Sequence, residues 1–168
     1  KRAPMSLPEI NQLLDTLEQQ LRQHLQQHQI DQPLLVGIRT GGVWIAEQLQ
    51  QRLSLSGPMG VLDISFYRDD FTRHGLHPEV KGSSLPESLE DRDIILVDDV
   101  IKSGRTIRAA MNELFDFGRP ARITLVSLLD VGQRELPIQP DVCAHRLTLK
   151  GNKVIKLSGQ QPLTLSLS

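Results

Sequence analysis

Several residue types are rare in this chain of 168 residues, and each scarcity excludes certain kinds of structure. Cysteine occurs once, at Cys143, so an intrachain disulfide is impossible and a reducing cytosol is the simplest setting. Aromatic residues make up only 4% of the chain, so a core must be built mainly from Leu, Ile and Val. No apolar run approaches the about 20 residues that a membrane-spanning helix needs, so we expect no membrane partner.

Strong charge of either sign is also missing. The formal net charge is −1 and the pI is about 6.6, which argues against indiscriminate binding to a nucleic-acid backbone. A local basic patch is still compatible with this balance. The hydrophobic fraction of 39% and the charged fraction of 23% are those of an ordinary globular protein, and the length predicts one domain with a single substantial core.

What the sequence does contain is a series of apolar strands that alternate with helices. This order predicts an α/β domain around a mostly parallel sheet. Ser6 and Glu9 fit a capping box that would start the first helix. The expected elements are a helix to about residue 25, strands at 34–38, 61–67, 94–97 and 123–129, helices at 43–53 and 104–117, and short strands at 154–157 and 163–167.

A long stretch between the second and third strands has no sustained period. Residues 68–92 are polar and contain glycine and proline, which in a compact domain is typical of a functional loop. A second loop, 130–140, follows the fourth strand. We interpret Cys143 as a small buried residue and Trp44 as a packing residue.

The stretch IILVDDVIKSGRT, residues 94–106, carries the main chemical signal. In a parallel sheet, ligands bind beyond the carboxyl ends of the strands, where we expect Asp98 and Asp99. Residues 102–106 then lead into a helix, whose first N–H groups and dipole favour a phosphate. Gly104 allows close approach of the backbone, while Ser103 and Thr106 add hydroxyl donors.

Other phosphate-binding loops do not fit this stretch. The sequence contains neither GxxxxGK[ST] nor GxGxxG, which excludes the Walker loop and the dinucleotide fingerprint. A phosphate-accepting receiver domain would have the acidic pair but no use for the loop beside it. An acidic helix cap with a purely structural role would explain one aspartate but not two.

The two carboxylates cannot face the phosphate, because like charges repel. The 2′- and 3′-hydroxyls of a ribose are suitable partners, since a carboxylate accepts O–H bonds well. A second strand end, Gly37 to Gly42, offers another anion site with Arg39 nearby. Together the two sites predict a sugar that carries a 5-phosphate and, at C1, a diphosphate.

These residues resemble a known family. An aliphatic run, two acidic residues and xxx[ST]GxT form the signature of type I phosphoribosyltransferases. The segments DISFYRDDF (63–71), ILVDDVIKSGRT (95–106), GRPARI (118–123) and RELPI (134–138) are similar to those of the PyrR branch, the bifunctional pyrimidine operon regulators and uracil phosphoribosyltransferases. The resemblance implies the type I phosphoribosyltransferase fold as one domain over residues 1–168. The flexible loop would cover about 68–92, and a small hood would comprise about 130–168 with the N-terminal segment.

The resemblance also implies a reaction and the residues that perform it. Uracil and phosphoribosyl pyrophosphate (PRPP) would give UMP and diphosphate, with Mg²⁺ bound through PRPP rather than by the protein directly. Asp98 and Asp99 would hold the ribose diol. Thr40 and Gly41 would form part of the diphosphate loop with Arg39 beside them, and Arg68, the third catalytic residue, would contact the diphosphate. The remaining PRPP- and UMP-binding residues implied are Lys102, Ser103, Gly104, Arg105 and Thr106.

Position 102 distinguishes between two classes of base. Purine-using relatives commonly carry an aspartate there, which faces a ring nitrogen of the base. Lys102 cannot accept that proton while it is charged, so a pyrimidine is favoured over the alternative, hypoxanthine or guanine.

The resemblance further implies regulation of pyrimidine genes in response to UMP or UTP, through pyrimidine operon mRNA, by a homo-oligomer, dimer or tetramer. Here DVGQRELP stands where PyrR proteins usually read DRGHRELP, so Val131 and Gln133 replace an arginine and a histidine of the RNA-facing side. Weak RNA binding is therefore expected. The candidate RNA contacts are Arg22, His24, Arg134 and Arg146. The alternative from another class is a nucleotide-sensing regulator without significant catalysis or RNA binding.

Overall fold

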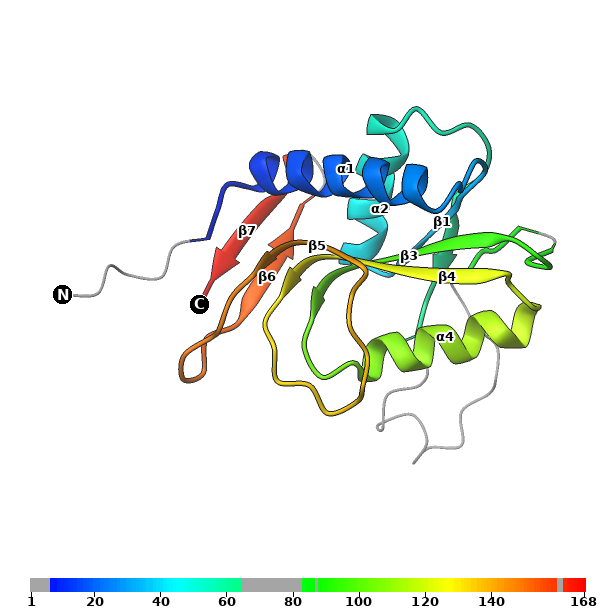
Figure 1. Cartoon of the computed structure of the whole chain (residues 1–168). Helices are drawn as coiled ribbons and strands as arrows, with labels where there is room; N and C mark the ends of the chain where they lie inside the picture. The colour runs from blue at the N-terminus through cyan, green and yellow to red at the C-terminus, as the bar shows by residue number, and fades with distance from the viewer. Residues whose placement is uncertain (1–6, 65–82, 87, 160–161) are drawn as a thin grey trace.

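A computed structural model describes residues 7–64, 83–86, 88–159 and 162–168. A five-stranded sheet with the strand order β2-β1-β3-β4-β5 forms its centre. All neighbouring strands in this sheet are parallel. Helices α1 and α2 lie on one face and α4 lies on the other, so the domain has three layers (Figure 1). The predicted α/β class and parallel sheet are confirmed.

The strands of the central sheet are short at its β2 edge and longest in the middle. Their bounds are β1 Leu34–Ile38, β2 Gly60–Leu62, β3 Asp93–Ile101, β4 Arg122–Asp130 and β5 Val142–Arg146. Within β3, side chains alternate between the two faces, as a strand requires. Ile95 and Val97 pack with α1 and α2, whereas Ile94 and Leu96 pack with α4.

Each helix in the described ranges buries one apolar face. These helices are α1 Ile10–Gln27, α2 Gly41–Arg52 and α4 Arg105–Phe117. In α1 the buried residues are Leu13, Leu14, Leu17 and Leu21, which follow helical spacing. Trp44 of α2 packs against the same core cluster, as predicted. No helix in the described part of the chain has the length and apolar character needed to cross a membrane.

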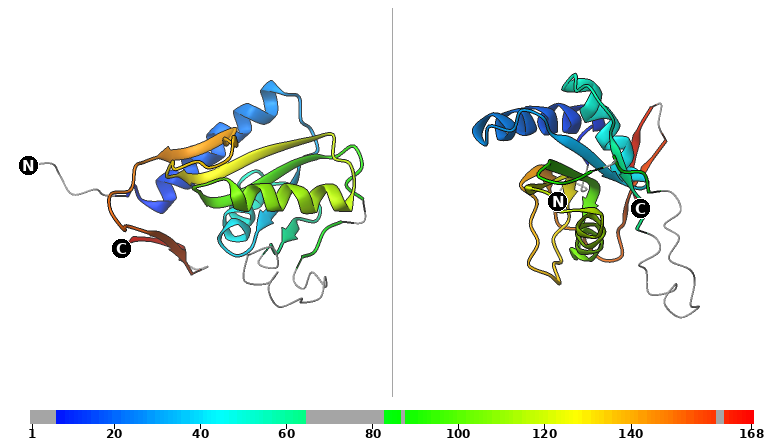
Figure 2. Two further views of the ribbon diagram at one scale, coloured as in Figure 1. Left: turned by 90° about the horizontal axis from the view of Figure 1, so that it is seen from below. Right: turned by 90° about the vertical axis from the view of Figure 1, so that its right-hand side faces the viewer.

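The C-terminal residues form a separate antiparallel hairpin of β6 Ile155–Ser158 and β7 Thr164–Leu167. It lies apart from the central sheet, beside the N-terminal half of α1 (Figure 1, Figure 2). Leu157 and Leu163 of this segment are buried in the core cluster that α1 and α2 share. The two predicted C-terminal strands are therefore confirmed, each with a boundary shift of one residue.

Several boundaries differ from the predictions. Helix α1 begins at Ile10, and Glu9 occupies its N-cap position with extended backbone angles, whereas Ser6 of the predicted capping box lies outside the described residues. The second strand ends at Leu62 rather than at residue 67. β5 was not predicted, because its apolar start is short. Val142 and Cys143 are buried, but the polar His145 and Arg146 follow within the same strand. Cys143 is buried, as expected.

Candidate active site

The acidic pair lies inside β3 and not beyond its end. β3 continues to Ile101, whereas the prediction ended it at residue 97. The strand pairs with β1 only as far as Val97 and with β4 as far as Ile101. Asp98 and Asp99 therefore follow the point where β1 ends, at the carboxyl edge of the sheet. The prediction was wrong about the strand end but right about the edge.

Asp98 is held in an unfavourable electrostatic position. Its side chain is 6% exposed, and its Oδ1 accepts the backbone N–H of Asp99 at 2.9 Å. Burial raises the pKa of Asp98 well above its ordinary value, and the adjacent charge of Asp99 raises it further. Asp99 is half-buried, and its Oδ1 accepts the N–H of Val100 at 2.8 Å. A group that supplies O–H donors or positive charge would relieve this pair.

The loop after β3 has the geometry expected of an anion site at a helix start. Gly104 caps α4 with a φ of 94°, a conformation that favours glycine. The Oγ of Ser103 accepts the N–H of Arg105 at 3.1 Å, so this hydroxyl orders the first turn. Lys102, Arg105 and Thr106 are exposed at the same place. Residues 102–106 thus form the predicted loop and helix start.

The second predicted loop meets the acidic pair directly. Arg39 and Thr40 are joined by a cis peptide bond, and α2 begins at Gly41. A Cβ on Gly41 would overlap the carboxylate of Asp99, and one on Gly42 would overlap the carbonyl oxygen of Val97. The backbone at Gly41 therefore lies against Asp99, and only glycine permits so close an approach. Arg39 and Thr40, which precede it, are exposed.

A third segment, the 131–141 connection between β4 and β5, supports the phosphate loop. The N–H groups of Glu135 and Leu136 both donate to the carbonyl of Ser103, at 3.0 and 3.2 Å. This connection and the loop before α4 lie side by side where the arrowheads of β3 and β4 point (Figure 1). Sequence reasoning placed the hood here but missed its hydrogen bonds to the phosphate loop, which follow from tertiary contact alone.

The candidate RNA contacts fall into two groups at opposite edges of the sheet. His24 of α1 lies near Asp141 and Arg122, which precede β5 and begin β4. Arg22 pairs with Glu18 and donates to the carbonyl of Arg52 at 2.7 Å. Arg134 and Arg146 both lie near Asp130, at the end of β4. The structure therefore does not gather the four residues into one surface.

Arg68 lies outside the described residues, as does most of the predicted 68–92 loop. Of the described part of that loop, Ser84 forms an antiparallel bridge with Val61. Ser83 donates to the buried carboxylate of Glu113 on α4, at 3.1 Å. In the described ranges no group of three or more His, Cys, Asp or Glu side chains could hold a metal ion.

Comparison with known proteins agrees with this geometry. A family model described as the phosphoribosyl transferase domain matches residues 6–152. The protein named "Bifunctional protein PyrR" of Pseudomonas paraeruginosa is 55% identical over 161 residues, which cover 96% of this chain and 95% of the relative. The protein of the same name from Pseudomonas fluorescens is 53% identical over 163 residues, 97% of each chain.

This chain belongs to the PyrR family of phosphoribosyltransferases. Solved structures confirm the fold. The hypoxanthine phosphoribosyltransferase of Trypanosoma cruzi superposes with a TM-score of 0.67 over 91% of this chain and 85% of that one, at 15% identity. A hypoxanthine-guanine phosphoribosyltransferase of Bacillus anthracis gives 0.68 over 92% and 86%, also at 15%. The predicted type I phosphoribosyltransferase fold is therefore confirmed.

Proposed function

We propose that this PyrR family member transfers the phosphoribosyl group of PRPP to uracil, which gives UMP and diphosphate. The observation that supports this most is the position of the buried acidic pair. Asp98 and Asp99 lie between a helix start suited to the 5-phosphate and the Thr40–Gly41 loop that contacts Asp99. These three parts follow strand ends at one edge of the sheet, which is the arrangement that a ribose with a 5-phosphate and a diphosphate at C1 would require.

In this proposal the ribose diol binds to the carboxylates. The 2′- and 3′-hydroxyls would donate to Asp98 and Asp99, and these bonds would offset the repulsion between the two side chains. The 5-phosphate would accept hydrogen bonds from the backbone N–H groups at the start of α4, with Ser103 and Thr106 beside it. The anomeric carbon would then face the Thr40–Gly41 loop.

Mg²⁺ fits this donor set as a companion of PRPP. Magnesium ions commonly bind substrate phosphates and keep several waters, so PRPP would carry the ion, and the Asp98 and Asp99 carboxylates, whose oxygens accept the diol, would favour its positive charge. When bound with PRPP, the ion would neutralise charge on the departing diphosphate. Arg39 and, in the 68–92 loop, Arg68 would contribute positive charge from the protein.

The residues of this chain would act by positioning and by stabilising charge. Displacement of diphosphate from the anomeric carbon builds positive charge on the ribose, next to the Asp98 and Asp99 carboxylates. No covalent nucleophile is required for such a step. Closure of the 68–92 loop over the ligand would exclude water, which otherwise competes with the base.

A pyrimidine is the favoured base. Lys102 is exposed at the phosphate loop, and its ammonium group donates hydrogen bonds but cannot accept one. The structural similarity to hypoxanthine phosphoribosyltransferases concerns the fold and does not argue for a purine. We therefore propose uracil, with hypoxanthine and guanine as the competitors to be tested in the same assay.

A second activity, regulation of pyrimidine genes, is favoured by the similarity to proteins named bifunctional. These relatives are 53–55% identical over nearly the whole chain. We propose that UMP or UTP occupancy of this site controls an interaction with pyrimidine operon mRNA, in a cytoplasmic homo-oligomer, a dimer or a tetramer. Arg22, His24 and Arg146 are the exposed or half-buried residues offered for that contact.

The test of catalysis is a uracil phosphoribosyltransferase assay with PRPP and Mg²⁺, in which Asp99→Asn is the control. We expect the wild-type rate to exceed that of the variant by about a hundredfold or more, because the diol would lose an ionised acceptor. Uracil, hypoxanthine and guanine are compared at equal concentration. A wild-type rate no greater than that of Asp99→Asn would refute the catalytic proposal.

The test of regulation is a titration of pyrimidine-leader RNA at physiological salt, with and without UMP. The expected result is binding that tightens when UMP is present, because ligand and RNA would stabilise the same conformation. A double substitution of Arg22 and His24 to glutamine should weaken RNA binding and leave UMP binding intact. RNA affinity that does not respond to UMP would contradict the regulatory proposal.

A further inference from the structure

One arginine joins the hood to the phosphate loop. The guanidinium of Arg134 forms a bidentate pair with Asp130, with Nη1 to Oδ1 at 2.9 Å and Nη2 to Oδ2 at 2.6 Å. Its Nη1 also donates to the carbonyl of Lys102 at 2.8 Å, and its Nε donates to the carbonyl of Ile138 at 2.6 Å. The remaining donor of Nη2 reaches Gln139 Oε1 at 3.1 Å.

These contacts use the whole donor capacity of the side chain. A guanidinium has five N–H donors, and the acceptors named above number five. The Arg134 side chain is only 15% exposed. A nucleic-acid phosphate would have to replace an existing partner, so the contacts argue for an internal role in place of the RNA contact predicted from the sequence.

The acidic partner of Arg134 is Asp130, which belongs to a paired strand of the central sheet. Asp130 ends β4 and stands beside Ile101, the last residue of β3. Burial by itself would raise the pKa of Asp130, but hydrogen bonds from Arg134 and the Gly132 N–H, with the charges of Arg134 and Arg146, hold it below the ordinary value. An ionised Asp130 therefore holds Arg134 next to the residue where the phosphate loop begins.

The bond to Lys102 fixes the direction of a peptide group. In a trans peptide the carbonyl of one residue and the N–H of the next point in opposite directions. When Arg134 holds the Lys102 carbonyl toward the hood, the N–H of Ser103 must point away from it. In the same way, the bonds from Glu135 and Leu136 to the Ser103 carbonyl turn the N–H of Gly104 away from the hood.

The loop is also fixed by packing. A Cβ on Gly104 would stand 3.4 Å from the Cβ of Ile138 and 3.5 Å from that of Leu136, so the hood lies close against the glycine. Arg134 holds the carbonyl of Ile138 on this side. With both carbonyls directed to the hood and the glycine packed against it, the N–H groups of Ser103 and Gly104 are directed away from the hood.

We propose that Arg134 is a positioning residue for the 5-phosphate of the ligand. Through Asp130 and the Lys102 carbonyl, it orients the N–H groups of the 102–104 loop toward the phosphate without touching the ligand. The proposal rests on the proposed function, since it requires that a ribose 5-phosphate binds at this loop. The arginine of the RELPI segment thus supports phosphate binding rather than RNA binding.

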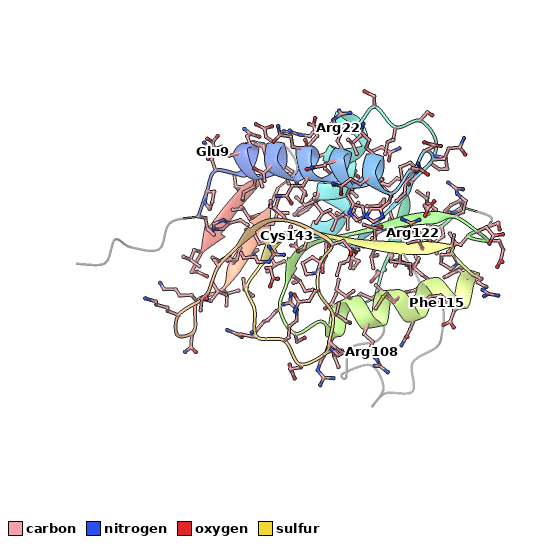
Figure 3. The ribbon with its side chains drawn as sticks, viewed as in Figure 1. Glu9, Arg22, Arg108, Phe115, Arg122 and Cys143 are labelled. Carbon is pink, nitrogen blue, oxygen red and sulfur yellow. The ribbon has the colours of Figure 1, made fainter. Side chains whose placement is uncertain are left out.

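The experiment compares the affinities of UMP and uridine, which differ only in the 5-phosphate. Isothermal titration gives the ratio of the two dissociation constants for the wild type, Arg134→Gln and Arg122→Gln. Arg122 is the matched control, because it forms an ion pair with Asp93 that joins the same two strands at their opposite ends. Arg122 lies at the start of β4, far from the start of α4 where Arg108 lies (Figure 3).

We expect Arg134→Gln to lower the preference for UMP over uridine by about tenfold or more, and to raise the KM for PRPP with little change in the KM for uracil. Arg122→Gln should keep the wild-type ratio. General loosening of the fold would weaken both ligands and leave their ratio unchanged. Arg134→Lys preserves the charge but not the bidentate geometry, so it should lower the ratio too, and it serves if the glutamine variant does not fold.

Three outcomes separate the claims. A wild type that binds UMP no better than uridine would refute the proposed ribose 5-phosphate site itself. A wild type with a clear UMP preference that Arg134→Gln and Arg134→Lys both retain would refute the positioning role alone. A lowered ratio in both variants, with Arg122→Gln at the wild-type value, is the result that supports it.

Discussion

Two buried aspartates on neighbouring strands, Asp98 within β3 and Asp130 at the end of β4, have opposite electrostatic surroundings. Asp98 of β3 is 6% exposed and Asp130 of β4 is 5% exposed. Burial raises the pKa of Asp98, and the like charge of Asp99 raises it further. Asp130 is paired with Arg134, lies 3.8 Å from Arg146, and has a lowered pKa.

This difference separates a ligand site from a support. A buried carboxylate with a raised pKa lowers the free energy of unfolding when it is ionised. A bound ligand that donates hydrogen bonds to it can offset this loss. A carboxylate held by a bidentate arginine is satisfied within the chain and gains nothing from a ligand. Asp98 therefore fits direct ligand contact, and Asp130 fits the role of an anchor for the phosphate loop.

The largest expected effect comes from breaking the satisfied pair. Asp130→Asn should lower the free energy of unfolding by about 3 kcal/mol, because it leaves the guanidinium of Arg134 largely buried without its counter-charge. Chemical denaturation monitored by circular dichroism measures the change. The double variant Asp130→Asn with Arg134→Gln should recover part of the loss. If the single variant loses less than about 1 kcal/mol, the pair is not the anchor described here.

Asp98, which lies beside a like charge, should respond in the opposite direction. Asp98→Asn is expected to raise the free energy of unfolding by about 1–2 kcal/mol near neutral pH, because it removes a buried charge beside Asp99 while its Oδ1 can still accept the Asp99 N–H. UMP affinity should fall at the same time. A variant that is less stable than the wild type would show that Asp98 is a structural residue.

Local patterns were sufficient to predict most of the fold and the strand, loop and helix that carry the candidate site. The apolar run before Asp98, the glycine at 104 and the helical period after it are short-range features, and the strand, the loop and α4 follow from them. The proximity of Gly41 to Asp99 was implied by the parallel order, which places strand ends at one edge.

The parts that could not be predicted depend on contacts between distant segments. β3 extends past Asp98 because β4 pairs with it as far as Asp130. From the sequence alone, two adjacent acidic residues are more typical of the end of a strand. The role of Arg134 depends on a carbonyl 32 residues earlier in the chain, which leaves no mark in the sequence. A basic residue in a loop was therefore interpreted as a surface residue.

The two aspartates should also give stability profiles of opposite slope in pH. Folding raises the pKa of Asp98, so the folded state binds more protons and the contribution of Asp98 falls as pH rises above about 4. Folding lowers the pKa of Asp130, so its contribution is complete above the ordinary value of 3.8 and is lost as pH falls below it. Wild-type minus variant unfolding curves from about pH 3 to 7 measure both slopes. Slopes of equal sign for Asp98→Asn and Asp130→Asn would contradict the comparison.

The smallest effect is expected at the opposite end of the same strands. Arg122 and Asp93 begin β4 and β3, with Nε to Oδ1 at 3.6 Å and side-chain exposures of 45% and 31%. Solvent screens such a pair, so Arg122→Gln should change the free energy of unfolding by no more than about 0.5 kcal/mol. A double-mutant cycle over Asp93 and Arg122 should therefore give a far smaller coupling than one over Asp130 and Arg134. Equal couplings would mean that burial and bidentate geometry do not distinguish the two pairs, and that the carboxyl edge of the sheet has no special anchor.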